Sequence, residues 1–226
     1  MSYYSSSRSL YATLVYTRRG MPAAAAVRSL TGILGVCLLA CLLNGCLGGG
    51  SNAVRYYVID PAGDSAGMES PGKPLAIEIT DLHIPQYLER FQIVTRDGDN
   101  QLHLSENNQW GENLRKNLMR TLAQNLSVRL HTIDVGTPLN RSASTPDYRL
   151  QVYITRFERG VDGVVRLDAS WQVSAESAQV LGTYSSNLDS GSAVAGKDYT
   201  AIVTSMQDLY ARLCAKIADT LIEKEK

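Results

Sequence analysis

The pattern of apolar and polar residues predicts strands first and a helix only after residue 110. Between residues 54 and 106, apolar side chains tend to alternate with polar ones, as in strands with one buried face. The strands predicted there cover residues 54–60, 74–84, 91–96 and 101–106. The last two flank the sequence DGDN, residues 97–100, which is rich in turn-forming residues. This pair therefore predicts a β-hairpin.

Two segments show a helical period instead. In the first, leucines recur every four residues while basic and amide side chains occupy the other faces. These residues are Leu114, Leu118, Leu122 and Leu126, with Arg115, Lys116, Arg120 and Gln124 opposite them. Asn107 or Asn108 is expected to cap this helix. The second helix lies at the C-terminus, where an apolar stripe faces inward and charged residues face water. Its stripe is Ile202, Met206, Leu209, Leu213, Ile217 and Leu221, and its charged residues are Asp208, Arg212, Lys216 and Asp219.

Alternating segments return between these helices and complete the predicted fold. They cover residues 128–133, 148–160, 163–175 and 179–189, and the sequence GVDG at 160–163 predicts a second hairpin. The expected fold is therefore an α/β single domain. It consists of a mixed β-sheet of about six or seven strands with two amphipathic helices packed on it.

The N-terminal 45 residues are predicted to be a signal peptide rather than part of this domain. They contain four arginines and no acidic residue, and they end in an apolar run at 30–43. That run is shorter than the roughly 20 residues needed to cross a bilayer, so it fits the apolar core of a secretory signal. Met1 and Met21 both remain candidate start sites. Arg18 and Arg19 suggest twin-arginine export as an alternative, but an ordinary basic N-terminal region is favoured.

The apolar run leads into the sequence LLNGC, residues 42–46, which resembles the lipobox of bacterial lipoproteins. In such proteins the signal is removed before the cysteine, and the cysteine carries the lipid. Cys46 is therefore the predicted lipidation site, although an ordinary signal that contains a cysteine remains the alternative. Leu47 stands where inner-membrane lipoproteins usually carry aspartate, which favours the periplasmic face of the outer membrane. The predicted organisation is a signal peptide at 1–45, a lipidated cysteine and flexible tether at 46–53, and one domain at 54–226.

Charge and cysteine content narrow the classes of partner and chemistry. Removal of the four N-terminal arginines leaves 18 basic against 22 acidic residues, so the mature chain is mildly acidic. It lacks the basic run that nucleic-acid binding would predict. Cys214 is the one cysteine left beside Cys46 after signal removal, which rules out an internal disulfide between unmodified cysteines. Its place in a helical pattern favours a small buried side chain.

Motifs for catalysis or metal binding are missing from the mature sequence. It contains no G-x-S-x-G, no H-E-x-x-H, no phosphate-binding glycine loop and no C-x-x-C. His83, His103 and His131 each fall in a predicted strand, and their spacing is not that of metal ligands. Glu78 and Asp81 lie near His83, but surface strand residues explain them better than an acid–base set. We therefore expect no enzyme activity, no cofactor and no bound metal.

The lipobox, RYYVID and the long segment 84–114 together resemble the auxiliary lipoprotein family of ABC-type transport systems. That family usually shows I-P-x-Y-L-D-R-P-Q-I-V at the hairpin, N-x-L after the turn, R-W-x-E-x-L at the helix start and L-x-x-N-L within the helix. The matching residues are Ile84, Pro85, Tyr87, Leu88, Arg90, Gln92, Ile93, Val94, Asn100, Leu102, Trp110, Glu112, Leu114, Leu122, Asn125 and Leu126. Glu89, Phe91, Gln109 and Asn113 depart from the pattern.

The resemblance implies a role in intermembrane lipid transport. In such systems an inner-membrane ABC permease and ATPase act with a periplasmic MCE-domain protein, and the lipoprotein is the outer-membrane partner that docks this conduit. Tyr87, Arg90 and Trp110 are residue types enriched at interface hot spots, so they are the candidate partner-binding residues. The alternative for each is packing between a helix and the sheet. Homo-oligomerisation stays open.

A second class of function also stays open at this stage. A lipid-anchored periplasmic hydrolase or a cell-wall enzyme regulator would have to assemble its site from scattered residues such as His83, Asp81 and Ser105. A neighbouring gene for an MCE-domain protein would favour the transport role instead.

Overall fold

The computed structural model describes residues 53–62, 74–194 and 198–225. The region from Asn52 to Lys226 forms one compact unit. The predicted signal peptide, Cys46 and the tether up to residue 52 lie outside the described residues.

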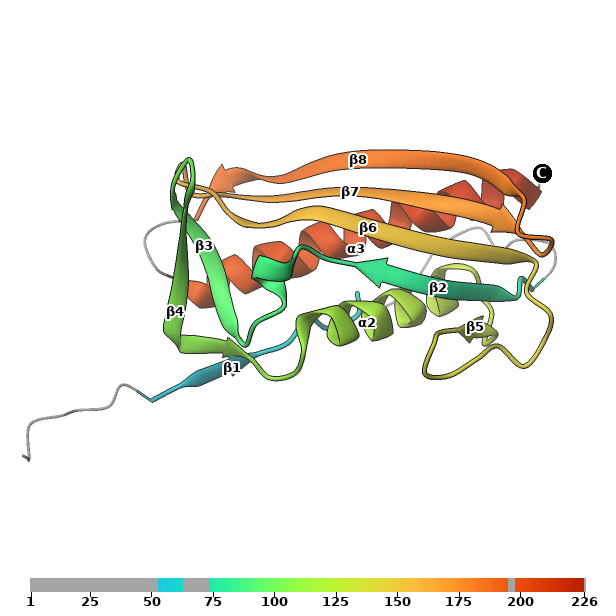
Figure 1. The fold of residues 1–226 in the computed structure, drawn as a ribbon, viewed down its shortest axis with the longest axis horizontal. Coiled ribbons are helices and arrows are strands. Elements are labelled where there is room, and N and C mark those ends of the chain that lie inside the picture. Colours follow the sequence, from blue (N-terminus) through green and yellow to red (C-terminus); the bar gives the residue numbers. More distant parts are fainter. Residues whose placement is uncertain (1–52, 63–73, 195–197, 226) are drawn as a thin grey trace, which may run out of the picture. The chain divides into compact units, whose positions relative to one another are not determined.

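One mixed sheet of eight strands and two long helices make up the described fold (Figure 1). The strands are β1 (Arg55–Tyr57), β2 (Ile77–His83), β3 (Gln92–Gly98), β4 (Gln101–Trp110), β5 (Val135–Gly136), β6 (Tyr148–Arg159), β7 (Val164–Ala175) and β8 (Val180–Ala193). The helices are α2 (Leu114–Arg129) and α3 (Tyr199–Glu225), and a short 3₁₀ helix, η2 (Gln86–Leu88), follows β2. This arrangement confirms the predicted α/β class with a mixed sheet and two helices.

Strand β6 is the centre of the sheet. On one edge it pairs antiparallel with β7, which in turn pairs with β8. On its other edge β2 runs parallel to the first half of β6, from Tyr148 to Tyr153, while β3 meets it near its end at Arg159. The hairpin β3–β4 then carries β1 on its outer side. Segments far apart in sequence therefore converge along one strand.

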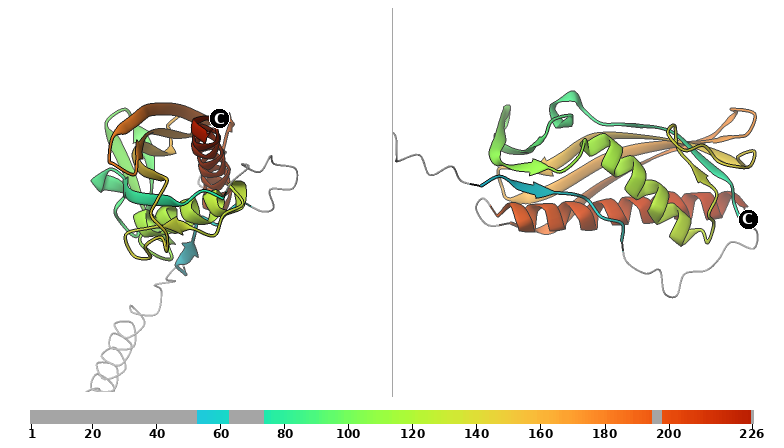
Figure 2. Two further views of the ribbon diagram at one scale, coloured as in Figure 1. Left: turned by 90° about the vertical axis from the view of Figure 1, so that its right-hand side faces the viewer. Right: turned by 90° about the horizontal axis from the view of Figure 1, so that it is seen from below.

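Both helices pack against the same face of the sheet (Figure 2). Their stripes form a core with the inward side chains of the strands, because alternating strand positions and every third or fourth helical position are apolar. The Tyr210 hydroxyl of α3 donates to the Leu118 carbonyl of α2 at 2.8 Å, so the helices are joined by a buried hydrogen bond as well as by packing. None of the helices in the described part of the chain has the length and apolar composition needed to cross a membrane.

Both predicted hairpins are confirmed. β3 and β4 pair across Asp99 and Asn100, and β6 and β7 pair across the GVDG turn. Gly163 in the second turn has a φ of 85°, and a Cβ there would lie 2.9 Å from the Ala193 Cβ. Backbone conformation and space therefore both require glycine at this position.

The structure corrects the prediction for residues 128–133. This segment is not a strand, because the leucine stripe of α2 continues one step further to the fully buried Leu130 at the helix C-cap. His131 follows in a turn with a φ of 50°, so it does not lie in a strand either. The strand in this part of the chain is instead the short β5, which pairs with β2.

The predicted cap of α2 was also wrong. β4 extends through Trp110, so Asn107 and Asn108 lie within a strand. Asn113 caps the helix instead, and its side chain accepts a hydrogen bond from the Lys116 N–H at 3.1 Å.

Candidate functional site

The three candidate partner-binding residues lie in different environments. Arg90 is exposed, Tyr87 is partly buried, and Trp110 is only 3% exposed within the core. The alternative interpretation, packing at a corner of the fold, therefore describes the position of Trp110. Phe91, next to Arg90, is 62% exposed, so an aromatic and a guanidinium side chain reach the surface together between η2 and β3.

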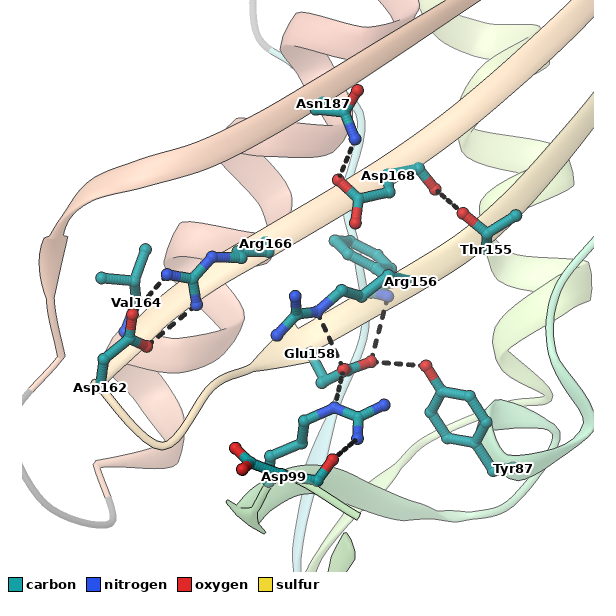
Figure 3. Close-up of polar contacts among 12 residues, drawn as sticks. Tyr87, Asp99, Thr155, Arg156, Glu158, Asp162, Val164, Arg166, Asp168 and Asn187 are labelled. Carbon is teal, nitrogen blue, oxygen red and sulfur yellow. Dashed lines mark hydrogen bonds and ion pairs between the residues drawn. The ribbon is translucent and has the colours of Figure 1, made fainter. Parts of the chain in front are cut away.

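A buried carboxylate holds this surface segment in place. Glu158 on β6 is fully buried, and its Oε2 accepts the Tyr87 hydroxyl at 2.6 Å (Figure 3). Its Oε1 accepts Nε of Arg96 at 2.7 Å and Nε of Arg156 at 3.1 Å. The Phe157 N–H also donates to Oε2, at 3.3 Å. A carboxylate out of water is stable only with such a set of charged and polar donors. We call Glu158, Tyr87, Arg96 and Arg156 the Glu158 cluster.

A change of register in β6 explains why Glu158 is buried. Up to Ile154 the even-numbered residues face the helices, as the contact of the Tyr148 hydroxyl with Glu225 on α3 shows. The pairing with β7 shifts between Ile154 and Arg156. After the shift Phe157 faces the helices and packs near Tyr210, with ring centroids 6.2 Å apart. Glu158 is thereby turned to the opposite face, where Tyr87 and Arg96 meet it.

Contacts with Glu158 shift the pKa values of Tyr87 and Arg96. Burial, together with the hydrogen bond to Glu158, raises the pKa of the Tyr87 hydroxyl well above its usual range. The hydrogen bond to Glu158 raises the pKa of the Arg96 guanidinium as well. Tyr87 therefore stays a neutral donor and Arg96 stays a cation at any ordinary pH.

The Glu158 cluster compensates for a weak junction in the sheet. The hairpin β3–β4 is joined to β6 through one register pair, Thr95 with Arg159. Arg96 on β3 and Tyr87 on η2 both bind Glu158, so side chains connect the hairpin and the 3₁₀ helix to the central strand. Arg90 and Phe91 lie between these two attachments. The cluster thus supports an exposed surface segment.

A second polar connection joins α2 to the segment after β1. Asn117 is buried, and its Oδ1 accepts the Ile59 N–H at 2.7 Å while its Nδ2 donates to the Ile59 carbonyl at 3.0 Å. Thr121 donates to the same carbonyl at 2.8 Å. One turn later Asn125, from the L-x-x-N-L motif, accepts the Ala62 N–H at 2.9 Å. This side of α2 therefore supplies the hydrogen bonds that a neighbouring strand would otherwise give.

Three of the residues considered for catalysis have partners of their own in the fold. Asp81 pairs with Arg115 at 3.4 Å and Glu78 pairs with Arg149 at 3.2 Å. Ser105 is buried in β4, where its hydroxyl oxygen accepts the Asn108 amide at 2.9 Å. Across the described residues no group of three or more His, Cys, Asp or Glu side chains could hold a metal ion.

Cys214 is fully buried on α3, as the sequence predicted. Burial raises the pKa of its thiol to about 12. The thiolate that would be needed for nucleophilic chemistry is therefore not formed at neutral pH.

Sequence reasoning missed the two residues that organise this region, Glu158 and Asn117. Glu158 lies in a strand between Arg156 and Arg159, and an acid among arginines in an apolar strand was the available signal. Asn117 interrupts the buried side of α2 next to Leu118, where a polar residue must find a partner.

The fold and the motif positions define the class of protein. The family described as the ABC-type transport auxiliary lipoprotein component matches residues 57–218, which is most of the chain and nearly all of the described fold. The chain belongs to this family, as the sequence resemblance indicated.

Individual relatives agree with this assignment. Over 137 residues the chain is 28% identical to the intermembrane transport lipoprotein PqiC of Escherichia coli K12, covering 60% of this chain and 71% of that protein. The PqiC of Shigella flexneri gives the same identity and coverage. An uncharacterised protein of known structure covers 75% of this chain and 99% of its own, with a TM-score of 0.60 and 22% identity. A protein from Xanthomonas campestris, with a TM-score of 0.62 and 10% identity, covers 74% of this chain and 95% of its own. These two structures show a shared fold.

Most of the residues that carry the family resemblance are core residues. Ile84, Leu88, Ile93, Trp110 and Leu114 are all at most 3% exposed. The motif therefore specifies the corner where β2, the hairpin and α2 meet. Arg90 and the turn residue Asn100 are motif positions that reach the surface.

Proposed function

We propose that the chain is a periplasmic lipoprotein, anchored in the outer membrane through Cys46, that docks the MCE conduit of an ABC-type lipid transport system without catalysing a reaction. The family match carries this proposal. The relative named as an intermembrane transport lipoprotein supports it. The lipobox and Leu47 support the anchor and its membrane.

The docking contact is proposed at Arg90 and Phe91, with the Glu158 cluster as its support. Both side chains are exposed; arginine is enriched at interface hot spots, and phenylalanine is enriched in the cores of interfaces. Tyr87 contributes by fixing the segment, because its hydroxyl is engaged by Glu158. Trp110 contributes through the core on which the segment rests.

Alanine at Arg90 or Phe91 should weaken binding of the chain to the MCE protein by about 1 kcal/mol or more at each hot-spot position. The free energy of unfolding should change little, because both side chains face solvent. Isothermal titration or surface plasmon resonance with the purified partner measures the affinity. Glu106→Ala, at an exposed position on β4, is the matched control and should bind normally.

Association of the unmodified chain with the MCE protein tests the proposed function itself. The two proteins should co-purify from cells that express the whole transport system. If the two proteins do not co-purify, the docking role is wrong. If they associate while both variants bind normally, the contact lies elsewhere on the surface.

Cys46→Ala should release the protein from the membrane fraction or leave an unprocessed precursor. Two acyl chains anchor a protein because each buried methylene contributes about 0.8 kcal/mol, and the variant carries none of them. Fractionation of cells labelled with radioactive palmitate measures both localisation and acylation. Cys41→Ala, within the apolar run, is the control and should leave labelling unchanged. Outer-membrane localisation of an unlabelled Cys46→Ala protein would contradict the proposed anchor.

A further inference from the structure

The outer face of α2 carries an open groove of about 790 Å³. It lies between the helix and the chain around β5, and we define it by its apolar residues Met119, Val128, Ile133 and Leu139 as the α2 groove. The size is within the roughly 300–1,000 Å³ typical of sites for small molecules. Neither the Glu158 cluster nor the proposed docking residues contribute to its lining.

Three of the apolar residues of the α2 groove are exposed. Ile133 is 101% exposed, Leu139 is 85% exposed and Val128 is 43% exposed. A single exposed apolar side chain is ordinary on a protein surface, but three around one concavity form a patch that favours a ligand. These residues add nothing to the core, so stability of the fold does not explain them.

All the charged residues that line the groove are basic. They are Arg115, Lys116 and Arg120, near the N-terminal end of α2, and no acidic residue is among the lining residues. Arg115 and Arg120 are paired with carboxylates outside the groove. In the described part of the chain, no carboxylate lies within 4.0 Å of the Lys116 ammonium group. An anion at this end would therefore find an available cation.

The geometry of the groove fits an amphiphile with one apolar chain. From Lys116 to Val128 the helix advances by about 18 Å at 1.5 Å per residue. The acyl chains of one leaflet fill roughly 15 Å, half of the hydrocarbon core of a bilayer. A hydrocarbon chain needs no hydrogen-bond partners, whereas a bound peptide would have to satisfy its own amide groups in an apolar groove.

We propose that the α2 groove binds one acyl chain of an anionic phospholipid, with the head group at Lys116 and the acyl chain along Met119, Ile133 and Leu139. This inference rests on the proposed function, since a lipid transport system is what would bring a phospholipid to this subunit. The protein is then a component that contacts lipid as well as one that docks a partner protein.

Photo-crosslinking with the full-length chain in vesicles tests the proposal. The vesicles contain phosphatidylglycerol with a photoreactive group in its acyl chain, and peptide mass spectrometry locates the labelled residues. Labels should concentrate on Met119, Val128, Ile133 and Leu139. Vesicles with the same group in phosphatidylcholine should label the groove less, because that head group carries no net charge. Equal labelling from both lipids, or labels spread evenly over the surface, would overturn the proposal.

Two variants give the test its specificity. Leu139→Glu should lower labelling of the groove about tenfold, since a carboxylate beside the acyl chain costs more than the 1.4 kcal/mol that a factor of ten represents. Val161→Glu, at an exposed apolar position in the β6–β7 turn, is the matched control and should label normally. Lys116→Glu should abolish the preference for phosphatidylglycerol. Unchanged labelling in Leu139→Glu would contradict the acyl-chain assignment.

Co-purification with the MCE protein separates this inference from the proposed function. Leu139→Glu should lose lipid labelling and keep the MCE partner. Loss of the partner by Leu139→Glu, together with absence of lipid labelling in the unmodified chain, would make the groove a protein-docking surface and overturn the lipid proposal. Leu139→Met keeps an apolar side chain at this position and should label as the unmodified chain does. Thermal unfolding of each variant tests whether the fold is retained.

Discussion

Replacement of Glu158 by alanine should lower the free energy of unfolding by about 2–4 kcal/mol. Breaking a buried ion pair typically costs 3–5 kcal/mol, because the remaining charge is left without a partner. The expected loss is smaller here, since the side chains of Arg96 and Arg156 are 26% and 30% exposed and can be hydrated in the variant. Urea unfolding followed by tryptophan fluorescence measures the change, because Trp110 and Trp171 are both buried.

One further variant tests a single contact of the Glu158 cluster, and another serves as the control. Tyr87→Phe removes one hydrogen bond to the carboxylate and should cost about 1–2 kcal/mol. Glu176→Ala, at an exposed position after β7, should have no measurable effect. A Glu158→Ala protein as stable as the unmodified chain would show that the cluster does not support the hairpin.

Asn117→Ala should destabilise the fold by about 2–4 kcal/mol. The variant loses both hydrogen bonds to Ile59, and a buried N–H left without a partner costs roughly 1–3 kcal/mol by itself. The Ile59 carbonyl keeps the Thr121 hydroxyl, which limits the total. Urea unfolding measures the loss of stability. Hydrogen exchange should also show that the Ile59 amide loses protection before the strands of the sheet do.

The control for this prediction lies on the same helix. Gln124→Ala replaces an exposed amide on α2 and should leave both the unfolding midpoint and the exchange of Ile59 unchanged. Normal protection of Ile59 in Asn117→Ala would mean that water or a neighbouring group replaces the side chain, and the proposed connection would then be unnecessary.

Elements with a strong local period could be predicted from the sequence. Both hairpins and both helices follow from residue spacing and turn composition within short windows. The strand prediction for residues 128–133 was wrong because the segment fits two periods at once. Leu130 continues the four-residue spacing of the leucine stripe of α2, and it also lies at the two-residue spacing of a strand with Val128 and Thr132. The helix prevailed because it buries Leu130 completely.

The arrangement around the site depends on contacts that no local pattern contains. The parallel pairing of β2 with β6 joins Ile77 to Tyr148, and the register shift in β6 decides which face Glu158 occupies. Residue type alone could not show that Trp110 is buried while Arg90 is exposed, since tryptophan is common both in cores and at interfaces. The family resemblance located the important segment, and the structure determined which of its residues reach the surface.

The outer edge of β8 has a consequence for how the protein behaves when it is crowded. Among the described strands β8 pairs with β7 alone, and Val180–Ala193 contains no proline and no lysine, the residues that usually discourage edge-to-edge pairing. Confinement to a membrane plane would bring such edges together far more often than free diffusion does. Register shifts at both ends of the β7–β8 pair, together with the φ of 70° at Gly191, bend this edge out of a flat line. An irregular edge of this kind makes edge-to-edge pairing between copies less favourable.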